Sequence, residues 1–409
     1  MDVPLRRNRD FVLLQAGQAL STIGSEASGL AYTLLVLALT NSPVKAGLAG
    51  FARLVPYALF ALPAGVAVDR WNRRRLMIWS DIVRVVALAS LGVSVASGRV
   101  TFVQILIVAF IEGTMFVIFN IAEIGAMRSV VPARQLQRAF ATEQARMSSV
   151  YLTGPPLGGF LFGLARSLPF LVDAISYAFS TGTLLAMRTP FQEEREEVGT
   201  ASLAAQIKEG LAWLWRHTFL RTCALLFVGT NFLFGALDLT LIVAARRQGL
   251  HSAVIGALVA AVGALSLIGS IAAPRFLKLL SMRTALIASG WLSLGIVAFL
   301  VKPNVYVLVA GFAPFILFNP TVNAMIIGYR VAIVPDRLQG RVNSVARSLA
   351  LLGLPLGPVV GGLLLGSFSA RATVGFLLVG FVLLAVVTTA SRAIRAAPSF
   401  DDVAGAAAS

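Results

Sequence analysis

The chain has 409 residues, of which 57% are hydrophobic and only 13% are charged, and its mean hydropathy is +0.84. An ordinary soluble domain is about 45–50% apolar and about 25% charged. Because so few polar residues cannot cover a soluble globule of this size, the composition favours a helical membrane protein with many spans. The net charge of +16 would suggest nucleic acid as a partner in a soluble protein. Here the basic residues lie in short loops between apolar runs, so we expect the lipid bilayer as partner and no nucleic acid.

The residue types that enzymes use are scarce. Cys223 is the only cysteine, which excludes an internal disulfide and fits no metal-ligand spacing. The two histidines, His217 and His251, stand beside no plausible nucleophile, and no phosphate-binding loop occurs. We therefore expect no enzyme activity, no metal and no cofactor. The energy source that we expect is a proton gradient.

Long apolar runs dominate the chain. A transmembrane helix needs about 20 mostly apolar residues. Twelve such runs occur, at about 11–40, 44–68, 76–96, 101–124, 143–165, 169–187, 219–243, 253–274, 284–301, 305–329, 345–366 and 372–391. The hairpin loops on one side of these runs are too short to hold a soluble catalytic domain.

Basic residues gather on alternate loops. The N-terminus, the loop at 69–75, the segment between spans 6 and 7 and the C-terminal end carry most of the arginines. Cytoplasmic loops carry the excess of Lys and Arg, so the pattern predicts that both termini are cytoplasmic, as an even number of spans requires. We expect a multi-pass protein of the cell (inner, cytoplasmic) membrane.

The composition changes between the two sets of six spans. The segment "QEEREE" is acidic, and apolar residues then recur at helical spacing over 203–214, which predicts an amphipathic helix on the cytoplasmic interface. The predicted organisation is a six-helix bundle at 1–187, a linker with this helix at 188–218, a second six-helix bundle at 219–391 and a disordered cytoplasmic tail at 392–409.

The two halves contain a repeat. Residues 131–159 align without a gap with residues 334–362, at a constant separation of 203 residues. The matched residues include Val131-Pro132 with Val334-Pro335, Arg134 with Arg337, Arg138 with Arg341, Gly154 with Gly357, Pro155 with Pro358, Gly158 with Gly361 and Gly159 with Gly362. Tandem six-span repeats are typical of transporters, whose substrate site lies near the membrane midplane.

Two motifs resemble those of a known family. The stretch "GVAVDRWNRRR" resembles motif A of the major facilitator superfamily, and the matching residues are Gly65, Asp69, Arg70, Arg73 and Arg74. Asn72 stands where glycine is usual, which we attribute to the tolerance of Asn for a left-handed turn. The stretch "GPPLGG" at 154–159 resembles motif C, which is associated with exporters. The chain is most similar to the branch with macrolide efflux pumps and the enterobactin exporter, and the resemblance implies two pseudo-symmetric six-helix bundles.

The resemblance also implies a role for the acid of motif A. Asp69 would bind the positive N-terminal end of span 11 when the cytoplasmic side is closed, as a latch. Arg73 would bridge Asp69 to an acid on span 4, for which Glu123 is the candidate. The matching loop of the second half keeps Gly269 but has Ala273 in place of the acid, so a latch would be one-sided.

Motif C combines residues that let helices approach and bend. Gly154, Gly158 and Gly159 permit close helix contact, and Pro155 removes a backbone donor. Plain helix packing and a hinge for gating both remain open, here and at Gly357, Pro358, Gly361 and Gly362.

Four ionisable residues within predicted spans stand out: Glu26, Arg53, Glu112 and Asp238. Charges in the membrane are costly and are usually functional, so these are candidates for proton coupling or for the wall of the substrate cavity. The structural alternative is an ion pair of Arg53 with Glu112 or Asp238. The arginine that the family's antiporters often carry on span 4 is absent, because Ala109 holds its position and Glu112 stands where Gln is usual.

These observations predict a secondary active transporter that exports small amphipathic molecules, such as a drug, an antibiotic or a siderophore-like compound. We expect alternating access, proton antiport and a monomer. The alternatives are an uptake symporter of the same fold, and a lipid flippase or non-transporting sensor.

Overall fold

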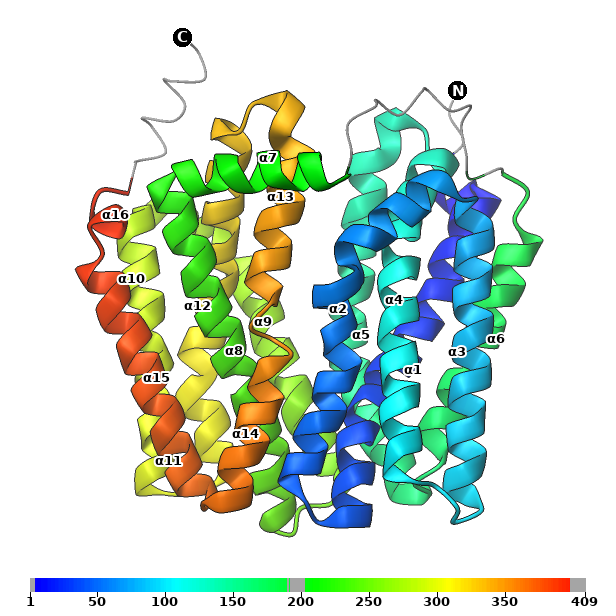
Figure 1. The fold of residues 1–409 in the computed structure, drawn as a ribbon, viewed down its shortest axis with the longest axis horizontal. Coiled ribbons are helices and arrows are strands. Elements are labelled where there is room, and N and C mark those ends of the chain that lie inside the picture. Colours follow the sequence, from blue (N-terminus) through cyan, green and yellow to red (C-terminus); the bar gives the residue numbers. More distant parts are fainter. Residues whose placement is uncertain (1–3, 190, 192–202, 398–409) are drawn as a thin grey trace. The chain divides into compact units, whose positions relative to one another are not determined.

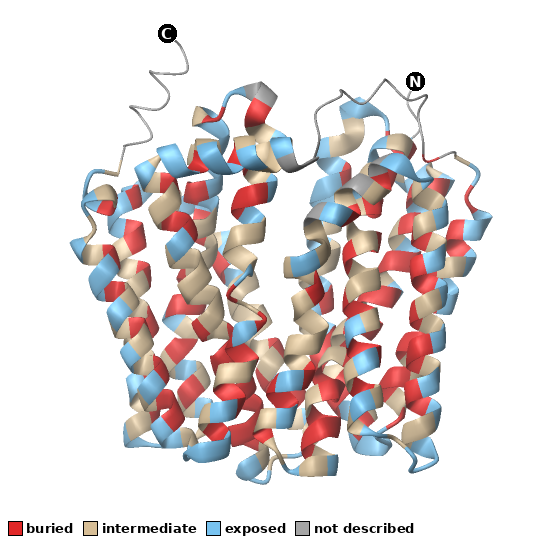
Figure 2. Cartoon of the chain, in the orientation of Figure 1, coloured by how far each residue is buried: buried red, intermediate tan, exposed pale blue. Residues whose placement is uncertain are grey.

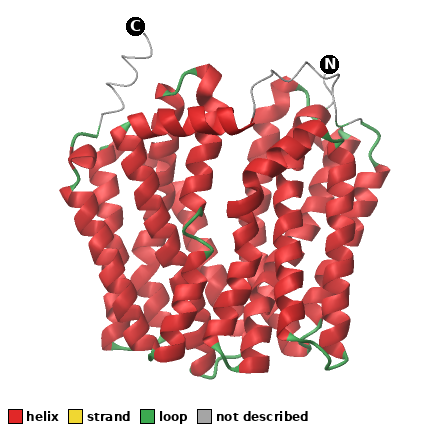
Figure 3. Ribbon diagram, in the orientation of Figure 1, coloured by secondary structure: helices red, strands yellow, loops and turns green. Residues whose placement is uncertain are grey.

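The computed structural model describes residues 4–189, 191 and 203–397, and every regular element in these ranges is a helix (Figure 3). Contacts divide the chain into two compact units. Unit 1 comprises Met1–Gly199 and Gly249–Ala260, and unit 2 comprises Thr200–Gln248 and Ala261–Ser409.

Unit 1 is built around its first long helix. The helices are α1 (Arg9–Thr40), α2 (Pro43–Arg70), α3 (Arg73–Ala96), α4 (Phe102–Val130), α5 (Leu136–Leu164) and α6 (Leu168–Ala186), with short 3-10 turns at Leu5–Arg7 and Ala133–Gln135 (Figure 1). Helix α1 contacts α2, α4, α5 and α6, and its residues are largely buried (Figure 2). Asn8 begins it by accepting a hydrogen bond from the Phe11 amide, as an N-cap residue does.

Unit 2 has a similar plan around α8. Its elements are α7 (Leu203–Arg216), α8 (Thr218–Arg247), the larger part of α9 (Ser252–Leu279), α10 (Met282–Leu292), η3 (Ser293–Ile296), α11 (Val297–Val301), α12 (Val305–Ile333), α13 (Asp336–Leu351), α14 (Leu356–Ser367), α15 (Ala370–Ala390) and α16 (Arg392–Arg395). Helix α8 contacts α12, α13, α14 and α15. The first turns of α9 pack with unit 1.

Each predicted apolar run falls on helical structure. Within the described residues, 11 helical segments are long and apolar enough to cross a membrane. The remaining run corresponds to α5, which is long enough but is not among these segments. The count of 12 spans therefore stays a prediction.

Two predicted spans are interrupted, and glycine or proline stands at each interruption. The run at 284–301 becomes α10, η3 and α11 where Gly295 meets Gly311 of α12. A Cβ added at Gly295 would lie 2.0 Å from the Gly311 carbonyl oxygen, so the backbones touch directly.

The second interruption separates α13 from α14 at residues 352–355. Gly353 and Pro355 stand here, whereas the matching positions of the first half hold Val150 and Leu152. Proline lacks an amide donor and restricts the residue before it. The repeat in sequence thus gives a continuous α5 but a broken α13–α14.

The predicted amphipathic helix forms as α7, and unit 2 covers part of its apolar face. Ile207 and Leu214 pack with apolar residues of α8 and α13, and Arg341 of α13 pairs with Glu209. Leu211 remains 37% exposed. The side chain of Leu203 lies outside the described residues. Helix α7 therefore packs against other helices of unit 2, and its position at a bilayer interface stays a prediction.

The start of the predicted disordered tail is ordered. Arg392–Arg395 forms α16, and Ile394 is fully buried against apolar residues of unit 2. The expectation of disorder fails at these residues because Ile394 has a core to enter. Residues 398–409 lie outside the described part.

Candidate functional site

Two of the predicted membrane charges form an ion pair in unit 1. The guanidinium of Arg53 on α2 donates from Nε to Glu112 Oε2 on α4 at 2.8 Å, and from Nη2 to Glu112 Oε1 at 3.2 Å. The same Nη2 donates to the Ser25 carbonyl oxygen of α1 at 2.9 Å. The Glu112 side chain is 1% exposed and that of Arg53 is 23% exposed. This pairing is the structural alternative that the sequence left open.

Glycines make room for this pair. A Cβ at Gly113 would lie 2.1 Å from the Arg53 carbonyl oxygen, and one at Gly29 would lie 2.5 Å from Arg53 Nη1. Both glycines therefore let α1, α2 and α4 converge on the guanidinium, as small residues do between membrane helices.

Glu26 joins the same group of charges. It is half-buried on α1 and interacts electrostatically with Arg53. Its Cβ contacts α5, because a Cβ added at Gly154 would lie 2.4 Å from it. Two carboxylates, Glu26 and Glu112, thus share the charge of one guanidinium.

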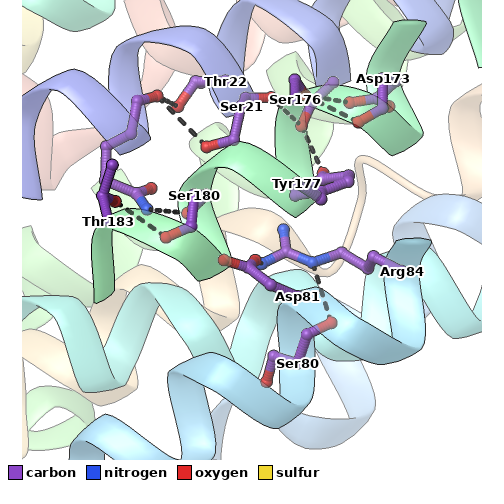
Figure 4. A network of polar contacts seen from close by, with 12 residues as sticks. Ser21, Thr22, Ser80, Asp81, Arg84, Asp173, Ser176, Tyr177, Ser180 and Thr183 are labelled. Carbon is purple, nitrogen blue, oxygen red and sulfur yellow. Dashed lines mark hydrogen bonds and ion pairs between the residues drawn. The ribbon is translucent and has the colours of Figure 1, made fainter. Parts of the chain in front are cut away.

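A second buried pair lies deeper between α3 and α6 (Figure 4). Arg84 Nη2 donates to Asp81 Oδ1 at 2.5 Å, and the two side chains are 3% and 0% exposed. The guanidinium carbon of Arg84 lies 4.1 Å from the ring centre of Tyr177 and 4.9 Å from that of Phe119. The two residues are three apart on α3, and cation–π contacts of Arg84 add to the ion pair.

Asp173 of α6 is a membrane carboxylate that the sequence reasoning missed. Its Oδ2 accepts from the Ser28 hydroxyl at 2.6 Å and its Oδ1 accepts from Ser176 at 3.2 Å. A Cβ at Gly24 would lie 2.5 Å from Asp173 Oδ1. The signal was available, since Asp173 is a lone acid in the apolar run at 169–187. Figure 4 shows it continuing the polar network of α1 and α6.

The expected bridge between Arg73 and Glu123 is replaced by another pair. Arg146 of α5 donates from Nη2 to Glu123 Oε1 at 3.0 Å, and from Nη1 to Thr22 Oγ1 at 3.1 Å. Arg73 lies against Gly125 of α4, where an added Cβ would be 2.7 Å from its Nε. Arg146 lies on the same side of α4 as Glu123, so helix packing and not motif position selects the partner.

Two residues of the motif A loop cap the ends of helices. Arg74 donates to the carbonyl oxygens of Leu184 at 3.0 Å, Leu185 at 2.9 Å and Met187 at 2.7 Å, and so caps the C-terminal end of α6. Asn72 has φ −65° and its side chain accepts from the Arg75 amide. It is an N-cap and adopts no left-handed turn, which corrects our explanation of this departure from the motif.

The other motif A residues give less information. Arg70 is exposed at the end of α2. Gly65 has no atom near the position of an added Cβ, so no close approach explains it. The side chain of Asp69 lies outside the described residues.

The motif C glycines pack α5 on α1. A Cβ at Gly158 would lie 2.3 Å from the Ala27 carbonyl oxygen. In unit 2, a Cβ at Gly361 would lie 2.9 Å from the Ala236 carbonyl oxygen of α8, and one at Gly357 would lie 2.3 Å from that of Phe232. The aligned glycines thus make the same kind of contact with the first helix of each bundle. Pro358 and Gly362 lie on α14 among them.

The next motif C residues contact α9 within unit 1. A Cβ at Gly159 would lie 2.2 Å from the Ser252 carbonyl oxygen, and one at Gly256 would lie 2.3 Å from that of Pro155. Neither backbone can accept a larger residue here without moving.

Asp238 lies in a pocket of unit 2. The lining is otherwise apolar, with Phe234, Leu237, Leu241, Val262, Leu308, Val309, Phe312 and Ile316. The Asp238 residue is accessible to solvent, and within the described part of the chain it has no hydrogen bond or ion pair. The motif C glycine contacts make Ala236 of α8 the counterpart of Ala27 of α1. The counterpart of Glu26 is therefore the residue before Ala236, and Asp238 lies three residues beyond that position.

His217 and Cys223 belong to the other reactive residue types, and their surroundings indicate a structural role. The His217 ring stacks on Trp213 at 3.9 Å between centres, and Cys223 is buried. Across the described residues, no group of three or more His, Cys, Asp and Glu side chains could hold a metal ion.

Comparisons with known proteins agree with this arrangement. A family model described as Major Facilitator Superfamily matches residues 15–290. Macrolide efflux protein A of Streptococcus pyogenes is 26% identical over 226 residues, which cover 55% of this chain and 55% of that protein. The match to this relative thus spans about half of its length.

Two further likenesses extend along nearly the whole chain. The multidrug efflux pump Tap of Mycolicibacterium fortuitum is 25% identical over 390 residues, or 92% of this chain and 93% of the pump. A crystal structure of a bacterial homologue of the human lysosomal transporter Spinster superposes with a TM-score of 0.72 at 14% identity, covering 95% of this chain and 98% of that one. The second likeness concerns the fold alone.

Proposed function

Because this chain belongs to the Major Facilitator Superfamily, it is a multi-pass membrane transporter and not an enzyme, and we propose that it exports small amphipathic molecules by proton antiport with alternating access. The observation that carries the export proposal is the likeness to two kinds of efflux protein, one of them along nearly the whole chain. Motif C on α5 supports the same direction.

The cluster of two carboxylates around Arg53 in unit 1 supports coupling to protons. The guanidinium of Arg53 neutralises the Glu112 carboxylate and donates two hydrogen bonds to it. Glu26 interacts electrostatically with the same guanidinium and is the more exposed of the two carboxylates. Since a charge in the membrane is costly, Glu26 is our candidate for the residue that takes up and releases the proton.

The membrane arrangement is part of the proposal. We propose 12 spans with both termini in the cytoplasm, in the cytoplasmic membrane, and a protein that works as a monomer without a cofactor or nucleic acid. The concentration of arginines on one set of loops supports the orientation. Asp69 as a latch to span 11 and motif C as a hinge are retained on the strength of the family motifs.

Transport in inside-out membrane vesicles tests the function. With an acidic lumen, we expect ethidium to accumulate in vesicles that contain the protein and to leave when the proton gradient is collapsed. Glu26→Gln should abolish this uphill transport but keep the exchange of labelled for unlabelled dye. Asp173→Asn is the comparison carboxylate.

The alternatives predict other results. An uptake symporter would accumulate substrate in right-side-out vesicles with an acidic exterior. A flippase would move phospholipid across protein-containing liposomes without dye-dependent proton flux. The proposal would be contradicted if the wild-type protein moved neither dye nor protons with any dye of a chemically varied set.

A further inference from the structure

Asp238 differs from the other membrane charges in its surroundings. Arg53 and Glu112 bind each other, Arg84 binds Asp81, and serine hydroxyls donate to Asp173. Asp238 has no such partner within the described residues, and it remains accessible. A carboxylate among apolar side chains costs free energy that an opposite charge can offset. The site is therefore short of one positive charge.

The walls of the Asp238 pocket suit an organic cation. The Phe234 and Phe312 rings lie 6.3 Å apart between centres, and Phe312 stacks on Phe315 at 4.8 Å. The face of an aromatic ring attracts a cation electrostatically, and it also packs against apolar groups. The pocket holds about 360 Å³ of empty space, part of which is open solvent.

We propose that this pocket is a subsite for lipophilic organic cations, with the positive charge beside Asp238 and the apolar body against Phe234 and Phe312. The carboxylate disfavours anions, because nothing in the described lining would neutralise two negative charges. A neutral molecule of the same shape keeps the apolar contacts but loses the attraction to Asp238. This inference deepens the proposed function, on which its role in transport rests.

Ligand binding to the purified full-length protein tests the subsite without requiring transport. The probes are tetraphenylphosphonium, whose charge does not depend on pH, and triphenylphosphine oxide, an uncharged molecule with similar aromatic groups. Isothermal titration calorimetry in detergent gives both affinities. We expect Asp238→Asn to weaken tetraphenylphosphonium binding at least tenfold and to change phosphine oxide binding less than twofold.

Two aromatic variants extend the test. Phe234→Leu should weaken binding of the cation more than binding of the neutral probe. Phe368→Leu is the control, because Phe368 is 48% exposed and lies outside the pocket lining. Since Cys223 is the only cysteine and is buried, melting followed with a thiol-reactive dye checks that each variant is folded.

Equal binding of tetraphenylphosphonium by the wild type and by folded Asp238→Asn would overturn the proposal. So would a variant that loses both probes alike, since the carboxylate would then act only through the fold. Failure here is separable from failure of the proposed function. Charge-dependent binding without proton-driven export supports the subsite alone, and proton-driven export without it supports the exporter alone.

Discussion

At the scale of single residues, one arginine of the motif A loop has a role beyond its charge. Arg74 binds three carbonyl oxygens at the end of α6. A planar guanidinium can serve several acceptors at once, whereas a lysine ammonium is a compact charge on a flexible chain. Charge alone would make the arginines of this loop equivalent, and the structure makes them different.

We predict that Arg74→Lys lowers the free energy of unfolding by about 1–2 kcal/mol, because hydrogen bonds to a charged group are lost while the charge stays. Arg75→Lys is the matched control, since Arg75 is exposed and, among the described residues, only its backbone amide forms a hydrogen bond. The measurement is melting in detergent followed at the Cys223 thiol. Equal melting of both variants would mean that Arg74 acts only by its charge.

The Arg53–Glu112 pair allows a second prediction at this scale. Removing one member leaves the other buried without a partner, so Arg53→Met and Glu112→Met should each destabilise the protein by about 3 kcal/mol. The double variant replaces both charges by apolar groups and should recover most of that loss. Melting of the three variants completes a double-mutant cycle. Additive losses would show that the two charges act independently.

At the scale of elements, glycine contacts decide how the helices pack. Gly158 of α5 touches the backbone of α1, whereas Gly163 of the same helix has no atom near an added Cβ. Aligned glycines on α14 contact α8 in the same way. The repeat in the sequence thus preserves the glycines that bring these helices together.

Gly158→Ala should therefore lower the free energy of unfolding by about 1–3 kcal/mol, as overpacking does. Gly163→Ala should leave it unchanged or raise it, because alanine favours the helix. The pair of variants is compared by thermal melting. A Gly158→Ala protein as stable as the wild type would show that α5 and α1 can separate without loss, as a mobile hinge would.

At the scale of the whole molecule, the open question for topology is whether α5 crosses the membrane. In a Cys223→Ala background, we predict that Ala133→Cys reacts with an impermeant maleimide only in inside-out vesicles. Arg166→Cys should react in intact cells. Both positions are exposed and flank α5. Labelling of both from the same side would contradict the count of 12 spans.

The latch belongs to the same scale. Asp69→Asn should slow transport while leaving substrate affinity nearly unchanged, because a latch stabilises one conformation and does not contact the substrate. Asp69→Glu keeps the charge and serves as the control. Transport rates and dye affinities in proteoliposomes give the comparison, and a wild-type rate in Asp69→Asn would rule out the latch.

The sequence by itself determined the helices and the family. Hydropathy and helix length are local properties, so the apolar runs predict where helices such as α1 and α12 begin and end to within a few residues. Motif A, motif C and the repeat are patterns of adjacent residues, and they identified the transporter family before any contact was known.

Only the tertiary structure decided which side chains meet. Arg53 and Glu112 are 59 residues apart, and the partner of Glu123 is Arg146 because α4 and α5 bring them together. Asp173 lies where α1 and α6 converge, and Asp238 is the one charged side chain among the described residues that line its pocket. Charge pairing in a bundle depends on helix rotation and separation, which arise from the packing of all the helices and are not written in any one segment.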